Sequence, residues 1–139
     1  MQGYDFEFLE HTADVGLAAR GKDLAEAFAA AGYGFSALMA DLTRAEPLEQ
    51  RAVEVAAEDE GGLLVAWLSQ LLYLFEVEGF LACQFAIGHI DGQSLRAQVW
   101  GDRFDPEKHP PNMAVKAVTY HQLQVVHNDG YEVRVYLDI

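Results

Sequence analysis

Cysteine, basic side chains and long apolar runs are all scarce in this sequence of 139 residues. Its single cysteine, Cys83, excludes a disulfide within the chain and favours a reducing compartment. No apolar run approaches the length of about 20 residues that a membrane-spanning helix needs, and no signal-like apolar segment follows Met1. We therefore expect a cytoplasmic protein that does not cross a membrane.

Acidic residues outnumber basic residues more than twofold. Nine Lys and Arg residues stand against 22 Asp and Glu residues, which gives a formal net charge of -13. An electrostatic field of this sign repels phosphate backbones, so direct nucleic-acid binding is not expected. The same field favours encounter with a basic protein surface, such as the RNA-binding face of an enzyme.

The apolar residues that are present follow the two periods of regular secondary structure. Their share of 51%, with 22% charged residues, is typical of a globular protein, and we expect a single domain over residues 1–139. Helical spacing predicts two helices, the first with Asp23 and Glu26 placed as a capping box. The predicted helices cover residues 24–38 and 64–75. Alternating spacing predicts strands at 4–9, 15–19, 48–57, 80–88, 94–101, 114–126 and 131–138.

The resulting order, ββαβαββββ, indicates the α+β class. We expect a two-layer sandwich in which two helices pack on a largely antiparallel or mixed sheet. The order of the strands within the sheet stays open, because alternation reports which face is buried and not which strand is adjacent.

Polar residues interrupt the apolar pattern at residues 10–14, at residues 116–121 and at the last two positions. A hairpin turning at residues 127–130 would bring the end of the chain back beside residues 116–119. If Val126 faces Tyr131, then Thr119 faces Asp138. Pleat parity then places Lys116 on the face of Ile139, away from Asp138 unless a bulge intervenes.

Three carboxylates are candidates for a metal site. Asp138 and the α-carboxylate of Ile139 are adjacent, and Asp14 in the same space would complete a cluster of hard oxygens suited to Mg²⁺ or Ca²⁺. The alternative is that Asp14 caps a turn and the terminus is solvated, and spacing alone favours it. Lys116, between apolar neighbours, either reaches solvent or pairs with an anion.

The histidines indicate no enzyme active site. His11 beside Asp14 has the form of a general base with its orienting carboxylate, but no nucleophile motif accompanies it, so a role in tying down a turn is favoured. We expect His121 to be hydrogen-bonded and partly buried. The five histidines show no zinc-ligand spacing, and no glycine-rich phosphate loop is present. No catalytic residue is assigned.

Four segments together resemble the archease family: EHTADVG at residues 10–16, LLVAWLSQLLYLFE at 63–76, VKAVTYHQL at 115–123 and RVYLDI at 134–139. They span the chain from end to end. The departures are small and lie outside the polar clusters. They are Gln70 for a frequent glutamate, Val15 and Leu17 for isoleucine, and Tyr131 for tryptophan.

The resemblance implies a protein cofactor of the tRNA-splicing ligase, which joins a 3′-phosphate or cyclic phosphate end to a 5′-hydroxyl. Members of the family promote guanylylation of the ligase's active-site histidine and its multiple turnover. Carried over by motif, the divalent-cation ligands are Asp14, Asp138 and Ile139. Lys116 matches a functionally important lysine, and His11 and His121 are further candidates for activating the partner.

Two other functions remain alternatives. The chain would act as a chaperone or modulator of an RNA-modifying enzyme, such as a tRNA methyltransferase, without needing Asp138. Alternatively, it would be a metal-dependent hydrolase using Asp14, Asp138 and His11, which predicts turnover of a phosphoester by the purified protein alone.

Overall fold

Seven strands and two helices follow one another in the predicted order in a computed structural model that describes residues 3–10 and 14–139. The first half contains β1 (Asp5–Glu10), β2 (Asp14–Gly21), α1 (Leu24–Met39), β3 (Glu49–Ala56) and α2 (Glu60–Glu78). The second half contains β4 (Phe80–Ile90), β5 (Ser94–Arg103), β6 (Ala117–His127) and β7 (Tyr131–Asp138). The order ββαβαββββ is therefore confirmed.

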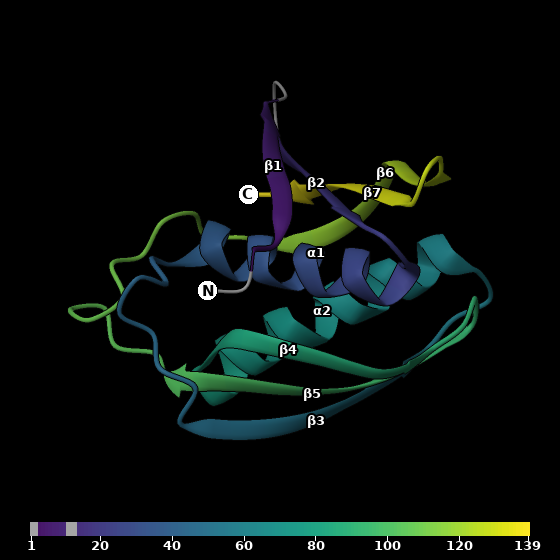
Figure 1. Ribbon diagram of the computed structural model, residues 1–139. Helices are drawn as coiled ribbons and strands as arrows, with labels where there is room; N and C mark the ends of the chain where they lie inside the picture. Colours follow the sequence, from purple (N-terminus) through teal and green to yellow (C-terminus); the bar gives the residue numbers. More distant parts are fainter. Residues whose placement is uncertain (1–2, 11–13) are drawn as a thin grey trace.

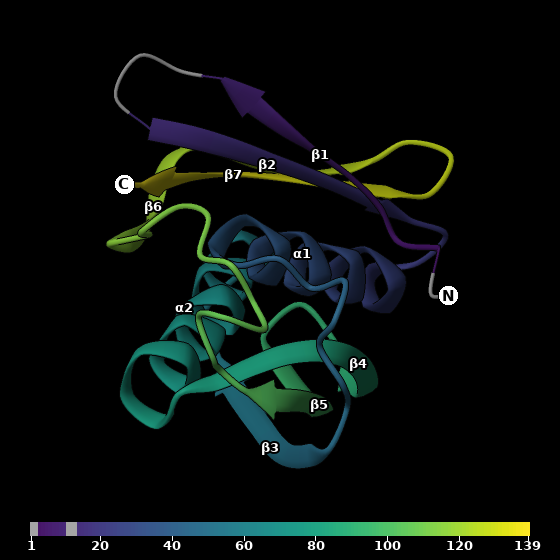
Figure 2. The same ribbon diagram turned by 90° about the vertical axis from the view of Figure 1, so that its left-hand side faces the viewer.

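The strands form two antiparallel sheets, one of four strands in the order β1-β2-β7-β6 and one of three in the order β3-β5-β4. The α+β class, with two helices packed on antiparallel sheets, is confirmed. The difference from a two-layer sandwich is that both helices lie between the two sheets, as Figures 1 and 2 show. A helix pair that is apolar on two sides needs a sheet on each of them.

Strand alternation decides which face of each sheet meets the helices. In β7, Val133, Val135 and Leu137 are buried, whereas the residues between them are half-buried or exposed. Because successive side chains point to opposite faces, this pattern directs one face to the core and leaves the other polar. The outer face of the four-stranded sheet is therefore the surface on which polar side chains of β2 and β7 lie.

Capping residues set where both helices begin. The Asp23 side chain accepts a hydrogen bond from the Glu26 amide (2.8 Å), and Glu26 in turn accepts one from the Lys22 amide (2.7 Å). The predicted capping box is thus present with its return bond displaced by one residue. Asp59 caps α2, and Gly79, at φ 65°, ends that helix in the left-handed conformation that glycine adopts most readily.

The core is centred on Trp67 of α2. Its side chain is fully buried, and its indole nitrogen donates to the carbonyl oxygen of Phe28 in α1 (2.9 Å), which joins the two helices. Gly32 allows this close approach, because a Cβ there would lie 3.2 Å from the indole ring. In the described ranges, neither helix has the length and apolar character that crossing a membrane requires.

The strand predicted from residue 114 begins three residues later. The preceding segment bonds to the end of α1 instead, since the amides of Asn112 and Met113 donate to the carbonyl oxygens of Met39 (2.9 Å) and Leu38 (3.0 Å). These bonds satisfy helix-terminal carbonyl groups, which have no partners within a helix. They also bring Val115 into the core and set the path of the chain into β6, which begins one residue after Lys116.

Candidate functional site

Asp14 and Asp138 are directly opposite each other in the antiparallel pair of β2 and β7. Residues opposed in this way project from the same face of a sheet, with Cβ atoms about 4.5–5.5 Å apart. Their neighbours Val15 and Leu137 are buried against the helices, so both aspartates lie on the outer face. Asp138 is exposed, whereas Asp14 is half-buried and its Oδ1 atom is buried.

Lys116 joins this pair through its backbone. Its amide donates to the carbonyl oxygen of Asp138 (2.7 Å), and the next residue, Ala117, is the direct partner of Asp138 in β6. The Lys116 side chain is exposed, and across residues 3–10 and 14–139 no ion pair joins it to a carboxylate. The strand ends of β2, β7 and β6 therefore place two carboxylates and one ammonium at one end of the sheet.

The pairing register of β6 with β7 differs from the predicted one. Tyr131 faces His127 instead of Val126, and Asp138 faces Ala117 instead of Thr119, so the predicted register is wrong. The pairing next to the turn is offset by one residue, and a long bulge, in which residues 120–123 stand opposite Val135 alone, then moves it by three residues in the other direction. Such a bulge shifts every pair beyond it, and simple alternation gives no sign of its size.

His121 belongs to this bulge and is exposed, not partly buried as expected. Its amide donates to Thr119 Oγ1 (3.2 Å), while that hydroxyl donates to the carbonyl oxygen of Tyr136 (2.9 Å). The His121 ring meets the Tyr136 ring edge-on at 6.2 Å. Tyr136 itself packs over Gly16, where a Cβ would come within 2.8 Å of its ring. His11 lies outside the described residues.

The residues at this end of the sheet fit a hard divalent cation by the chemistry of their atoms. Asp14 and Asp138 supply carboxylate oxygens, which Mg²⁺ and Ca²⁺ prefer, and one Asp14 oxygen is already buried. No three His, Cys, Asp or Glu side chains gather into a metal-binding group among the residues that the structure describes. Further oxygen ligands would therefore come from a carboxylate at Ile139, backbone carbonyls or water.

A second polar cluster, centred on Asp102, was not recognised in the sequence. The Asp102 carboxylate lies 3.1 Å from His109 Nε2 and 2.8 Å from Lys108 Nζ, and it accepts from the Glu46 amide (3.2 Å). His109 is fully buried, and its Nδ1 accepts from the Asp105 amide (3.1 Å), so its ring proton resides on Nε2. Burial disfavours the Asp102 anion, yet these bonds hold the pKa of its carboxyl below the ordinary value.

The cluster around Asp102 secures the loop between β5 and β6. Its members come from within a few residues of one another and from Glu46, so they hold the loop against the start of β3. The signal in the sequence was an aspartate at an inward strand position followed by a histidine and several prolines. That signal is weak without knowledge of burial. The cluster has a structural role, because its contacts hold the loop in place.

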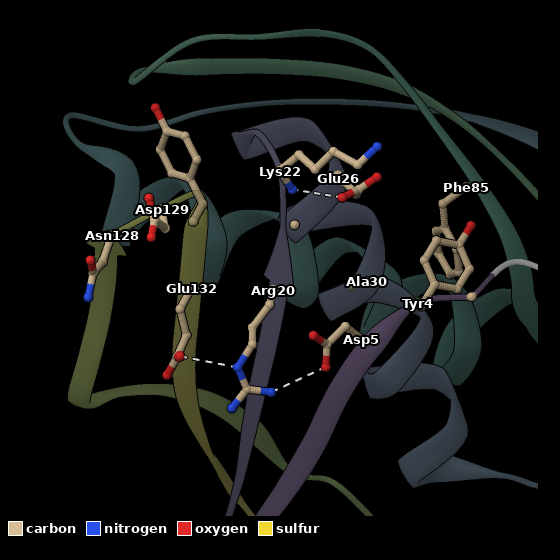
Figure 3. A pocket seen from close by; sticks show the side chains of 13 residues that line it. Tyr4, Asp5, Arg20, Lys22, Glu26, Ala30, Phe85, Asn128, Asp129 and Glu132 are labelled. Atoms are coloured by element: carbon tan, nitrogen blue, oxygen red, sulfur yellow. Dashed lines mark hydrogen bonds and ion pairs between the residues drawn. The ribbon is translucent and has the colours of Figure 1, made fainter.

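Arg20 organises the opposite end of the four-stranded sheet. Its guanidinium donates to Asp5 (3.3 Å), Glu7 and Glu132 (3.2 Å), and the Glu7 bond contributes most to raising the Arg20 pKa. Figure 3 shows the Arg20 guanidinium between Asp5 and Glu132. These residues line a cavity of about 690 Å³. Its three carboxylate partners neutralise this cation, so the charge that remains on the sheet face is predominantly negative.

Cys83 is a packing residue. It lies in β4, it is buried, and burial raises the pKa of its thiol to about 11, with a smaller contribution from Asp102. A thiol with this pKa is almost entirely protonated near neutral pH and is a poor nucleophile.

Two antiparallel sheets enclosing a helix pair, with paired aspartates at adjoining strand ends, define a class of small α+β protein that presents carboxylates at one end of a sheet. The chain matches the archease protein family over residues 6–139. It is 37% identical over 134 residues to protein archease of Sulfurisphaera tokodaii, covering 95% of this chain and 96% of that protein. It is 38% identical over 143 residues to protein archease of Methanosarcina acetivorans, covering 99% and 98%.

A solved structure agrees with this assignment. The solution structure of Methanobacterium thermoautotrophicum protein 1598 matches with a TM-score of 0.80 and 35% identity, over the whole of both chains. The chain belongs to the archease family. The resemblance inferred from the four sequence segments is therefore confirmed.

Proposed function

We propose that this chain is a cytoplasmic protein cofactor of the tRNA-splicing ligase, promoting guanylylation of the ligase's active-site histidine and its multiple turnover. Family membership supports the proposal, and the arrangement of Asp14 opposite Asp138 is the observation that carries it. Two carboxylates held on one sheet face repel each other, and a bound cation relieves that repulsion. The proposal assigns no catalytic residue to this chain, because the ligase supplies the reacting histidine.

In this proposal, Asp14 and Asp138 hold a divalent cation, Mg²⁺ or Ca²⁺, together with the carboxylate of Ile139 in a chain that ends there. When bound, the cation supplies charge neutralisation at the end of the sheet. Phosphoryl transfer depends mostly on positioning and charge neutralisation, which such a surface provides when it enters the ligase's active site. Lys116, exposed beside Asp138, orients a phosphate or a carboxylate of the complex.

Because Asp138 is exposed, its side chain can be replaced to test the proposed function without disturbing the core. The ligase is mixed with labelled GTP and this chain, with and without Mg²⁺, and guanylylation is followed over time. We expect Asp138→Ala to abolish stimulation, since the carboxylate is lost while no buried contact is removed. Asp14→Ala and Lys116→Ala are expected to reduce it. Glu76→Ala removes an exposed carboxylate from α2 and is expected to stimulate as the wild type does.

The outcomes separate the alternative functions. If Asp138→Ala, with an unchanged circular dichroism spectrum, still stimulates guanylylation at the wild-type rate, the proposed role of the carboxylate pair is wrong. Hydrolysis of a phosphoester by the purified chain alone would favour the hydrolase. Stabilisation of an RNA-modifying enzyme that persists in Asp138→Ala would favour the modulator.

A further inference from the structure

The bulge in β6 presents an aromatic side chain three positions along the strand from Ala117, the partner of Asp138. Residues 120–123 leave the regular ladder between Thr119 and Gln124, and Tyr120 within them is 68% exposed. Only three positions along the chain separate Tyr120 from Ala117, the partner of Asp138, a span of roughly 10 Å in a strand. β6 is also the edge strand of its sheet, and within residues 3–10 and 14–139 no strand pairs with its outer side.

The bulge is held in place at both ends. On one side, Thr119 Oγ1 donates to the carbonyl oxygen of Tyr136 and accepts from the amide of His121. On the other side, Leu123 packs on the first turn of α2, where a Cβ at Gly61 would lie 2.9 Å from Leu123 Cδ2. The irregular backbone between these anchors is therefore defined by contacts with two separate elements.

Gln122 lies between the anchors in a costly conformation. Its φ of 53° falls in the left-handed region, which residues other than glycine enter at a cost of about 1 kcal/mol or more. A residue held there by its surroundings is typical of functional sites. A backbone path that directs Tyr120 outward would account for this cost in conformational energy.

A groove of about 410 Å³ runs beside the bulge. Its apolar lining residues are Tyr120, Leu123 and Val125, and its acidic ones are Asp59 and Glu60 at the start of α2. The combination of apolar and acidic lining residues suits an apolar side chain flanked by basic residues. A partner surface with basic residues around an apolar side chain is also complementary in charge to this chain, whose net charge is -13.

We propose that the β6 bulge at residues 120–123 is the element by which this chain docks on its ligase, with Tyr120 as the anchor that contacts the ligase's basic RNA-binding surface. This inference rests on the proposed function. Tyrosine is among the residues that dominate binding energy at interfaces, because it buries a large rigid area at low entropic cost. Docking by Tyr120 and activation by Asp138 are then separate tasks of different residues.

The two tasks are separated by measuring affinity and stimulation independently. Binding of the full chain to the purified ligase is measured by calorimetry, and guanylylation is titrated to saturation. We expect Tyr120→Ala to raise the Kd, and the concentration for half-maximal stimulation, by about tenfold or more, while the maximal stimulation at saturation is retained. Asp138→Asn should show the reverse pattern, with binding retained and maximal stimulation lost.

Tyr73 provides a matched control. It is 50% exposed on α2, so Tyr73→Ala removes an aromatic ring of the same size from a different surface. We expect Tyr73→Ala to bind and stimulate as the wild type does. Gln122→Gly, which relaxes the backbone while keeping Tyr120, should weaken binding by a smaller factor and should not lower the melting temperature.

Wild-type affinity in Tyr120→Ala would overturn the docking role, as would an equal loss in Tyr120→Ala and Tyr73→Ala. The docking role would also be overturned if Tyr120→Ala lowered the affinity of the isolated chain for RNA and left its affinity for the ligase unchanged. Failure of the wild-type chain to bind or stimulate the ligase would instead overturn the proposed function. Affinity that falls with added salt in the wild type supports the basic partner surface.

Discussion

Asp14 and Asp138 face each other across β2 and β7, although one belongs to the start of the chain and the other to its end. The pair lies on the polar face of the four-stranded sheet, where the strand ends of β2, β7 and β6 converge (Figure 2). Like charges in directly opposed positions destabilise a sheet. A divalent cation bound between the two carboxylates would lower their mutual repulsion.

Replacing Asp138 by Asn should change the response of the fold to Ca²⁺. When a chelator removes divalent cations, Asp138→Asn is expected to be as stable as the wild type or more stable by about 0.2–1 kcal/mol. The reason is that the variant lacks the repulsion between the carboxylates of residues 14 and 138. Added Ca²⁺ should raise the melting temperature of the wild type and not that of the variant, because a ligand stabilises only the state that binds it. Differential scanning calorimetry measures both effects.

Glu76→Asn is the control for the loss of one negative charge, and it should respond to Ca²⁺ as the wild type does. A wild-type melting temperature that is unaffected by millimolar Ca²⁺ or Mg²⁺ would contradict a cation site at the aspartate pair. An equal response in Asp138→Asn would place the cation elsewhere.

The buried cluster around Asp102 should be important for stability. Asp102→Ala leaves His109 and Lys108 without their shared carboxylate, and removal of one partner from a buried polar network costs about 2–4 kcal/mol. Urea denaturation measures this loss as a shift of the midpoint. Glu107→Ala, a change at an exposed carboxylate of the same loop, should shift the midpoint little; a similar shift in both variants would argue against the cluster.

The contribution of Asp102 should also depend on pH. Its pKa in the folded chain lies below the value of about 3.9 expected in the unfolded chain. The stabilisation is therefore fully present above the unfolded-state pKa and is lost as the pH falls through the folded-state pKa. Wild type and Asp102→Asn should differ in free energy of unfolding at pH 6, and the difference should shrink on acidification. A constant difference across acid pH would contradict this assignment.

Cys83 should react with thiol reagents only when the protein opens. Its burial and its raised pKa, about 11, predict slow labelling by a disulfide reagent at about pH 8 and rapid labelling in denaturant. The labelling rate of the native protein should rise when Asp102→Ala lowers stability. Immediate stoichiometric labelling of the native wild type would contradict the burial of this side chain.

Local pattern was sufficient to locate the elements. Alternation and helical spacing predicted every strand and both helices, because each period reports which face of an element is buried and requires only neighbouring residues. The Asp23 and Glu26 capping pair was predictable for the same reason. The start of β6 was misplaced, because Asn112 and Met113 bond to the end of α1, a contact that no local pattern encodes.

The sequence by itself determined the element order, the polar segments and the family to which the chain belongs. Only the tertiary structure decided that the strands divide into two sheets, that Asp14 lies opposite Asp138, and that the β6 bulge brings Ala117 to Asp138 and turns Tyr120 outward. Strand neighbours and register are selected by burial and hydrogen bonding across the whole molecule. Residues far apart in the chain thus become a site only when the sheet has formed.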